Sequence, residues 1–261
     1  MARPSLIWAV PLLVLAVPAC RMDLDELAAE EAADSADVAT SEGALLVSGV
    51  DDSMTAPTAE TAAAGAQARA GGRFQPAGCA TVTRVANVVT YVLQNCTGPF
   101  GLVHVTGTAT ATFTDAAAGA VQIDLEGTDV KVNRAVIDFH TKGVLTVNGT
   151  QRTLVVTTEG KGTGPRGNAF TRTGGYTLTR DTATDCLALD GSWKLDARLA
   201  ERSTTVSGLS RCANACPAAG GSIVHTGFRG RTVTVELDGT SAASWSSSTG
   251  KSGTIDLACG G

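Results

Sequence analysis

Asp138 and His140 are the two residues of this chain whose types and spacing could most directly carry chemistry. Two positions apart on an extended strand, their side chains would share one face. There they could bind a metal ion together or form half of a proton relay. A catalytic or metal-bound histidine also needs a partner to orient it, and only His104, on the polar face of another strand, could complete such a site. Because Ile137 and Phe139 hold the alternate positions, we expect Asp138 and His140 on the solvent-facing side of a sheet, with no catalytic role.

A glycine-rich stretch, Gly162–Gly167, matches the GxGxxG pattern of dinucleotide-binding loops. That chemistry requires a strand before the loop, a helix after it, and backbone amides directed at the pyrophosphate. Pro165 has no amide hydrogen, and Ala169–Thr179 has the composition of a strand. We therefore expect a hairpin loop here, at which Lys161 and Arg166 could meet an anion.

The remaining candidates are weaker. Asp181, Asp185 and Asp190 lie close together in the sequence, but their spacing differs from that of an EF-hand loop, and a calcium site in a loop is the alternative interpretation. No serine lies in a nucleophile elbow. We expect no catalytic residue, no metal site and no cofactor, and we expect Trp193 and Trp245 in the core.

Cys20 indicates a different chemistry. Arg3 is the only charged residue among the first 20, and a short apolar run, Leu6–Ala19, separates it from Cys20. This order is typical of a secretory signal peptide, and the run is too short to span a bilayer as a helix, which needs about 20 residues. Val17-Pro18-Ala19-Cys20 resembles the lipobox of bacterial lipoprotein signals. The resemblance implies cleavage after residue 19, diacylation of the Cys20 sulfur and acylation of its new amine; ordinary secretion with a free cysteine is the alternative.

Six further cysteines follow, an even number that predicts three disulfides in an exported protein. They are Cys79, Cys96, Cys186, Cys212, Cys216 and Cys259. A zinc site around the close pair Cys212 and Cys216 is the competing interpretation.

The pairing can be hypothesised from hairpins, although six cysteines allow 15 connectivities. Cys79 and Cys96 flank an alternating stretch whose midpoint is Asn87-Val88, and Cys186 and Cys212 flank a second stretch centred near residues 198–201. The expected disulfides are Cys79–Cys96, Cys186–Cys212 and, by remainder, Cys216–Cys259.

Residues 20–72 differ from the rest of the chain. Between Arg21 and Ala70 there are 11 acidic and 2 basic residues and no aromatic residue. Such a segment buries too little apolar surface to offset its ordering entropy. We expect a disordered acidic tether that, as a coil, holds the folded domain about 40 Å from its anchor. A leader without a specific role is the alternative.

Residues 73–261 show the two-residue period of half-buried strands. In Val103–Phe113 apolar or small residues alternate with polar ones, and a slip of the pattern at Gly127 suggests a β-bulge. Asn148-Gly149, Gly174-Gly175 and Asp238-Gly239 indicate turns. We expect an all-β fold, an antiparallel meander of about ten or eleven strands that closes as a barrel or folds as a sandwich to protect its edges.

Several short motifs between Phe74 and Cys259 resemble a family of uncharacterised bacterial secreted lipoproteins with a disulfide-pinned β domain. They are Gly78-Cys79, Asn95-Cys96-Thr97-Gly98-Pro99, Cys186-Leu187-Ala188-Leu189-Asp190-Gly191-Ser192-Trp193, Cys216-Pro217 and Gly253-Thr254-Ile255-Asp256-Leu257-Ala258-Cys259. The resemblance implies a fold and a location, and no activity.

Together these observations predict a non-enzymatic cell-envelope lipoprotein, a binding or structural module. Arg21 follows Cys20 where an aspartate would resemble an inner-membrane retention signal, so we expect the outer membrane, with the domain facing the periplasm or the exterior. The expected partners are the membrane, through the lipid anchor, and an envelope protein or glycan, but no nucleic acid. A hydrolase of envelope or extracellular polymer is the alternative function.

Overall fold

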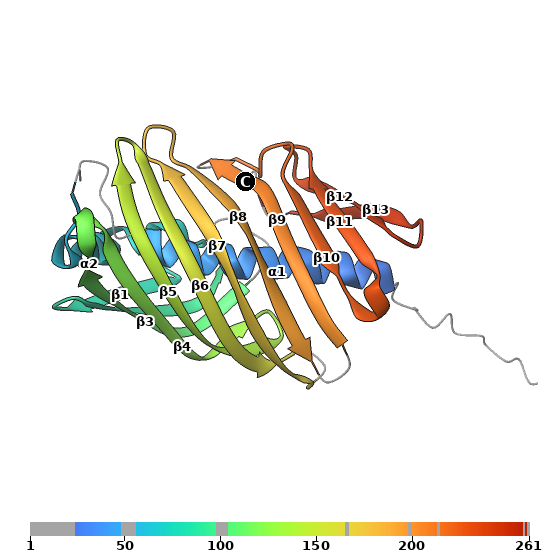
Figure 1. Ribbon diagram of the computed structural model, residues 1–261, viewed down its shortest axis with the longest axis horizontal. Coiled ribbons are helices and arrows are strands. Elements are labelled where there is room, and N and C mark those ends of the chain that lie inside the picture. Colours follow the sequence, from blue (N-terminus) through green and yellow to red (C-terminus); the bar gives the residue numbers. More distant parts are fainter. Residues whose placement is uncertain are drawn as a thin grey trace, which may run out of the picture.

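The computed structural model describes residues 24–47, 56–97, 104–164, 167–197, 200–212, 215–257 and 259. The described strands form one antiparallel sheet in which each strand pairs with the next along the chain (Figure 1). Two helices, α1 (Leu24–Val47) and α2 (Ala59–Arg69), pack against one face of this sheet. The predicted signal peptide and Cys20 lie outside the described residues.

The first seven strands include the longest ones of the sheet. They are β1 (Ala80–Val85), β2 (Val88–Thr97), β3 (His104–Asp115), β4 (Val121–Val132), β5 (Ala135–Asn148), β6 (Gln151–Thr163) and β7 (Ala169–Asp181). The last four of the remaining six are short. The six are β8 (Cys186–Ala197), β9 (Ala200–Cys212), β10 (Ser222–Thr226), β11 (Thr232–Leu237), β12 (Ala242–Ser247) and β13 (Ser252–Asp256). Three 3-10 turns, Ala70–Arg73, Ala117–Gly119 and Phe228–Gly230, interrupt the connections.

The antiparallel meander is confirmed, but the strand count and the closure are not. The described residues form 13 strands, and the order runs from β1 to β13 without a pairing between these two edges. The sheet is therefore open, and the helices cover its inner face in place of a second sheet. We call this inner, helix-covered face the trough.

Gly174 and Gly175 do not form the predicted turn but lie in the middle of β7. Gly174 pairs with Trp193 on β8, and a Cβ at position 174 would lie 2.4 Å from the Trp193 Cβ. The glycine therefore leaves room for the tryptophan, which is only 1% exposed. Trp245 is also buried, so both tryptophans lie in the core as predicted.

The prediction of a disordered tether is wrong for helices α1 and α2. Helix α1 lies along the trough and contacts strands β4 to β7, β9 to β11, and β13. Its alanines form one stripe of fully buried side chains, Ala29, Ala32, Ala36 and Ala39. Small side chains let the helix approach the sheet closely, and the Gly43 backbone packs directly against Leu178 of β7. The stripe is buried because the sheet supplies the partner surface that an isolated alanine helix lacks.

Helix α2 begins at Thr58, which forms a capping box with Thr61. The amide of Ala59 also donates to Asp115 at the end of β3, at 2.6 Å. Capping and this bond position α2 against strands β1 to β4. Of the described helices, none is long and apolar enough to cross a membrane.

One local prediction is confirmed, and a second holds with a shift of one residue. The register shifts between Gly127 and Val130 where β4 pairs with β5, so the predicted bulge is present. The connection between β5 and β6 is a two-residue turn, but it consists of Gly149 and Thr150, because Asn148 pairs with Gln151.

Candidate functional site

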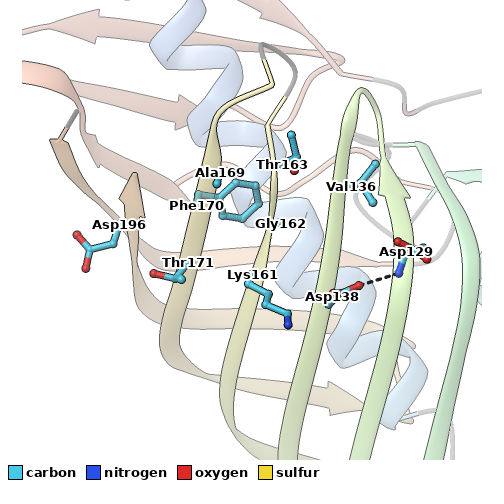
Figure 2. Close-up of a pocket in the computed structure, with 10 residues that line it drawn as sticks. All are labelled: Asp129, Val136, Asp138, Lys161, Gly162, Thr163, Ala169, Phe170, Thr171 and Asp196. Atoms are coloured by element: carbon cyan, nitrogen blue, oxygen red, sulfur yellow. Dashed lines mark hydrogen bonds between the residues drawn. The ribbon is translucent and has the colours of Figure 1, made fainter. Parts of the chain in front are cut away.

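A shallow groove of about 580 Å³ lies on strands β4 to β7 and at the end of β8 (Figure 2). Its polar lining comes from Asp129, Asp138, Lys161, Thr163, Thr171 and Asp196. Val136 and Ala169 are apolar lining residues on the same face as this polar lining. Gly162 and Phe170 also line the groove, and Phe170 packs against the core. The groove is the place where the chain brings Asp138 together with the glycine-rich hairpin predicted from the sequence.

The register of the sheet builds the groove. Asp138 of β5 pairs with Lys161 of β6, Lys161 pairs with Thr171 of β7, and Thr171 pairs with Asp196 of β8. Directly paired side chains on one face are about 5 Å apart, so these four form a continuous polar row across four strands. Asp138 also accepts a 2.8 Å bond from the Asp129 amide, which orients its carboxylate. The row presents carboxylate acceptors at both ends and an ammonium donor between them.

His140 does not line the groove, although it is on the same sheet face as Asp138. Its Nε2 lies 3.6 Å from Asp124 and 3.9 Å from Glu126, and its Nδ1 lies 3.4 Å from Glu159. The predicted orientation toward solvent is confirmed, because Ile137 is buried and the His140 side chain is 32% exposed. Among the described residues, no cluster of histidine, cysteine and acidic side chains has the arrangement of a metal site.

His104 does not complete a site with His140. It lies at the start of β3, where its Nδ1 is 3.3 Å from the Thr97 hydroxyl and its amide donates to Asn133. The three aspartates considered as a loop site also have separate partners: Asp181 accepts from the Ala183 amide, Asp185 pairs with Arg180, and Asp190 accepts from the Gly208 amide.

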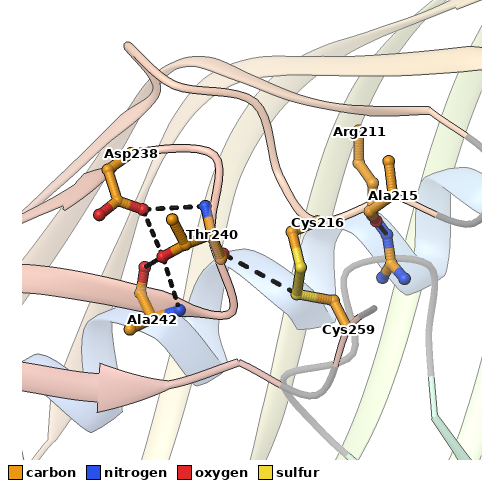
Figure 3. Close-up of a disulfide and its surroundings, with 7 residues drawn as sticks. All are labelled: Arg211, Ala215, Cys216, Asp238, Thr240, Ala242 and Cys259. Carbon is orange, nitrogen blue, oxygen red and sulfur yellow. Dashed lines mark hydrogen bonds between the residues drawn. A yellow bond between two sulfur atoms is a disulfide. The ribbon is translucent and has the colours of Figure 1, made fainter. Parts of the chain in front are cut away.

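The six predicted disulfide cysteines are joined as Cys79–Cys96, Cys186–Cys212 and Cys216–Cys259. The hypothesised connectivity is thus confirmed, and Cys186 and Cys212 are directly paired residues of β8 and β9. Figure 3 shows Cys216–Cys259 beside the loop that joins β11 to β12. In that loop Thr240 donates from its amide and its hydroxyl to Asp238, and these bonds lower the pKa of the Asp238 carboxyl. The Cys216–Cys259 disulfide joins the segment after β13 to the segment before β10.

The trough contains charged groups that sequence reasoning did not find. The Glu42 carboxylate of α1 accepts from Arg172 at 2.9 Å and from the Tyr176 hydroxyl at 3.4 Å, and all three residues are buried. Burial raises the pKa of Glu42, while the Arg172 charge opposes the shift. The Arg172 guanidinium lies over the Trp193 ring, 5.3 Å from its centroid. The helix is therefore held by a charge pair as well as by its alanine stripe.

A second group of charges lies nearer the start of α1. Glu31 pairs with Arg202 of β9. On β10 the buried His225 shares a 2.9 Å hydrogen bond with Thr204. Burial lowers the pKa of the His225 imidazole, the Glu31 charge opposes this shift, and the Arg202 charge adds to it.

The strand alternation in the sequence already places two arginines at core positions. Arg152 lies on the same strand face as Leu154, and Arg172 on the same face as Tyr176 and Leu178, which the alternation assigns to the core. Burying an arginine charge is costly unless the charge is paired, so an arginine at a core position predicts an acidic partner. The partner of Arg172 lies 130 residues away, which is why the strand pattern alone did not identify it.

No family model, curated protein or solved structure matches this chain. The functional argument therefore rests on the groove, the trough and the N-terminal sequence.

Proposed function

We propose that this protein is a lipid-anchored module of the bacterial cell envelope that binds an envelope glycan without transforming it. The location is supported by the lipobox-like sequence that ends at Cys20 and by three disulfides, which persist in oxidising compartments. Two or more acyl chains give stable membrane attachment, where one gives only marginal binding. The residue after the anchor, Arg21, favours the outer membrane.

The anchor is tested by fractionating cells that express the wild-type chain or Cys20→Ala. We expect the wild type in the outer-membrane fraction and the variant in the soluble envelope fraction. Equal membrane association of both proteins would contradict the anchor.

Glycan binding is supported chiefly by the polar row of Asp138, Lys161, Thr171 and Asp196 in the groove. Sugar hydroxyls both donate and accept hydrogen bonds, so they pair with carboxylates, an ammonium group and a threonine hydroxyl in one row. The groove is open along the sheet, so a polymer chain can cross it without threading. Val136 and Ala169, apolar lining residues on the same face as the polar row, suit the less polar faces of sugar rings.

The test is co-sedimentation of the purified protein with isolated peptidoglycan sacculi, complemented by a glycan array. We expect Asp138→Asn, Lys161→Met and Asp196→Asn each to weaken retention about 10-fold or more, equivalent to roughly 1.4 kcal/mol per lost contact. Lys142→Met and Glu126→Gln, charge-matched changes on the same sheet face outside the groove, should bind as wild type. Equal binding by the groove variants and the control variants would show that the groove does not bind the glycan.

The same samples also test the hydrolase alternative. A hydrolase would release reducing ends from the glycan over time, and Asp138→Asn or Asp196→Asn would abolish that release. A binding module leaves the glycan intact.

A further inference from the structure

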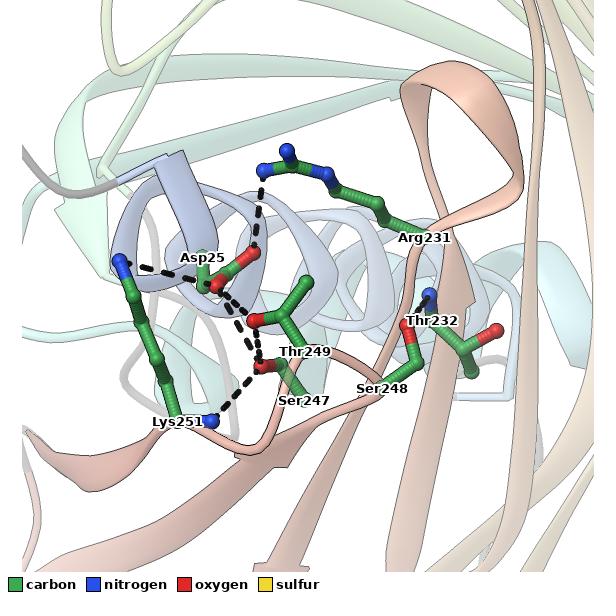
Figure 4. A network of polar contacts seen from close by, with 7 residues as sticks. All are labelled: Asp25, Arg231, Thr232, Ser247, Ser248, Thr249 and Lys251. Atoms are coloured by element: carbon green, nitrogen blue, oxygen red, sulfur yellow. Dashed lines mark hydrogen bonds and ion pairs between the residues drawn. The ribbon is translucent and has the colours of Figure 1, made fainter.

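The first turn of helix α1 is held by a network of polar contacts (Figure 4). Asp25, in the first turn of α1, accepts from the Thr249 hydroxyl at 2.6 Å and from the Ser247 hydroxyl at 3.3 Å. Arg231 and Lys251 lie 3.6 Å and 4.0 Å from the same carboxylate. The Asp25 side chain is only 2% exposed. This network joins the helix start to the connection between β10 and β11 and to the turn between β12 and β13.

The distance from this point to the anchor is short. Cys20 precedes Leu24, the first residue of α1, by four positions. Four residues span at most roughly 14 Å even when fully extended. A lipid on Cys20 therefore brings the bilayer close to this end of the sheet, because residues 24–47 of the predicted spacer are instead folded into the trough as α1.

We propose that the connection between β10 and β11 and the turn between β12 and β13 form the membrane-facing surface of the protein and contact anionic phospholipid headgroups. This inference rests on the proposed lipid anchor and extends it, because it assigns the orientation of the domain on the membrane. The anchor and the helix contacts together restrict the domain to one end-on arrangement.

The charges of this surface fit an anionic headgroup layer. Arg229 is exposed, and the side chains of Arg231 and Lys251 are 44% and 55% exposed. The nearest acids of α1 are Asp25, which is buried against these bases, and the exposed Glu26. Basic side chains within a Debye length of anionic lipids are attracted to them. The chain length sets which end faces the membrane, and the bases strengthen the contact.

The test uses the full-length lipidated protein in vesicles that contain headgroup-spin-labelled lipid. A fluorescent amino acid is introduced at Ser252, beside the β12–β13 turn, or at Thr150, in the turn between β5 and β6 at the opposite strand ends. We expect at least threefold stronger quenching at Ser252 than at Thr150. We also expect the Ser252 quenching to rise when phosphatidylglycerol replaces part of the phosphatidylcholine.

Paired variants test the charge contribution. Arg229→Gln with Lys251→Gln should remove the increase caused by phosphatidylglycerol, whereas Lys131→Gln with Lys142→Gln, exposed bases on β4 and β5, should retain it. Equal loss in both pairs would overturn the headgroup contact.

The acylation state of Cys20, read by mass spectrometry of the same sample, separates the two proposals. Acylated Cys20 with equal quenching at Ser252 and Thr150 overturns the orientation alone. Cys20 without acyl chains overturns the anchor and, with it, the orientation.

Discussion

The Glu42 carboxylate of α1 lies 2.9 Å from the Arg172 guanidinium of β7, and both side chains are 4% exposed. Removing one member of a buried ion pair leaves an uncompensated charge, which typically costs about 3–5 kcal/mol. We expect Glu42→Ala to lower the free energy of urea unfolding by that amount.

The matched control for this pair replaces both charges. Glu42→Leu with Arg172→Met should unfold at a higher urea concentration than either single variant, because apolar residues of similar volume substitute well for a buried pair. Methionine also retains packing against Trp193. Additive losses in the double variant would show that the two charges do not interact.

The burial of Ala32 provides an independent test of the docked helix. Ala32 is fully buried, whereas Glu30, two residues before it on the same helix, is exposed. Additional methylenes in a packed site typically cost about 1–3 kcal/mol. We expect Ala32→Leu to destabilise the protein by that amount in urea unfolding, and Glu30→Leu to change stability by less than about 0.5 kcal/mol, as at ordinary surface sites. A disordered segment would give no difference between the two variants.

The docked helix shows where sequence reasoning failed and why. Composition alone counts large apolar side chains, and residues 20–72 have few of them. The spacing of Ala29, Ala32, Ala36 and Ala39 nevertheless places them on one helix face. That face becomes a core only against a trough formed by strands that begin at Val121 or later, more than 70 residues beyond the end of the helix, so its burial is a tertiary property.

The position of the turn between β5 and β6 decides which residues lie opposite each other in the groove. A two-residue turn at Asn148-Gly149 would place Asp138 opposite Glu159. The turn one residue later places it opposite Lys161, and it places His140 opposite Glu159. The alternation correctly assigned Asp138 to the solvent face, but its partners depend on register, which the position of the turn decides. Two of the three disulfides were predictable because Cys79 and Cys96, and Cys186 and Cys212, flank symmetric stretches about a turn, and the third followed by remainder.

The buried His225 predicts a specific dependence of stability on pH. Its folded-state pKa lies below the ordinary value of 6.5, chiefly because burial disfavours the charged imidazole. The unfolded chain therefore binds a proton at a pH where the folded chain does not, and stability rises with pH. The contribution is present above pH 6.5 and is lost as the pH falls through the folded-state pKa.

The measurement is urea unfolding of the wild type and His225→Gln between pH 5 and 7.5. The stability difference between the two proteins should shift in favour of the wild type as the pH rises. A difference that is constant with pH, or that shifts in favour of the variant, would contradict the lowered pKa.

His140 is surrounded by carboxylates from β4 and β6 but is partly open to solvent. We expect it to be neither catalytic nor a metal ligand, because Asp124 and Glu126 contact one ring nitrogen as ion-pair partners and Glu159 contacts the other. Ion pairs between partly exposed groups contribute about 0–1 kcal/mol, so His140→Ala should change unfolding free energy by about 0.5 kcal/mol or less. Metal analysis of purified wild-type protein should find zinc at background. Stoichiometric zinc that is lost in His140→Ala would instead identify a metal site on this face and support the hydrolase alternative.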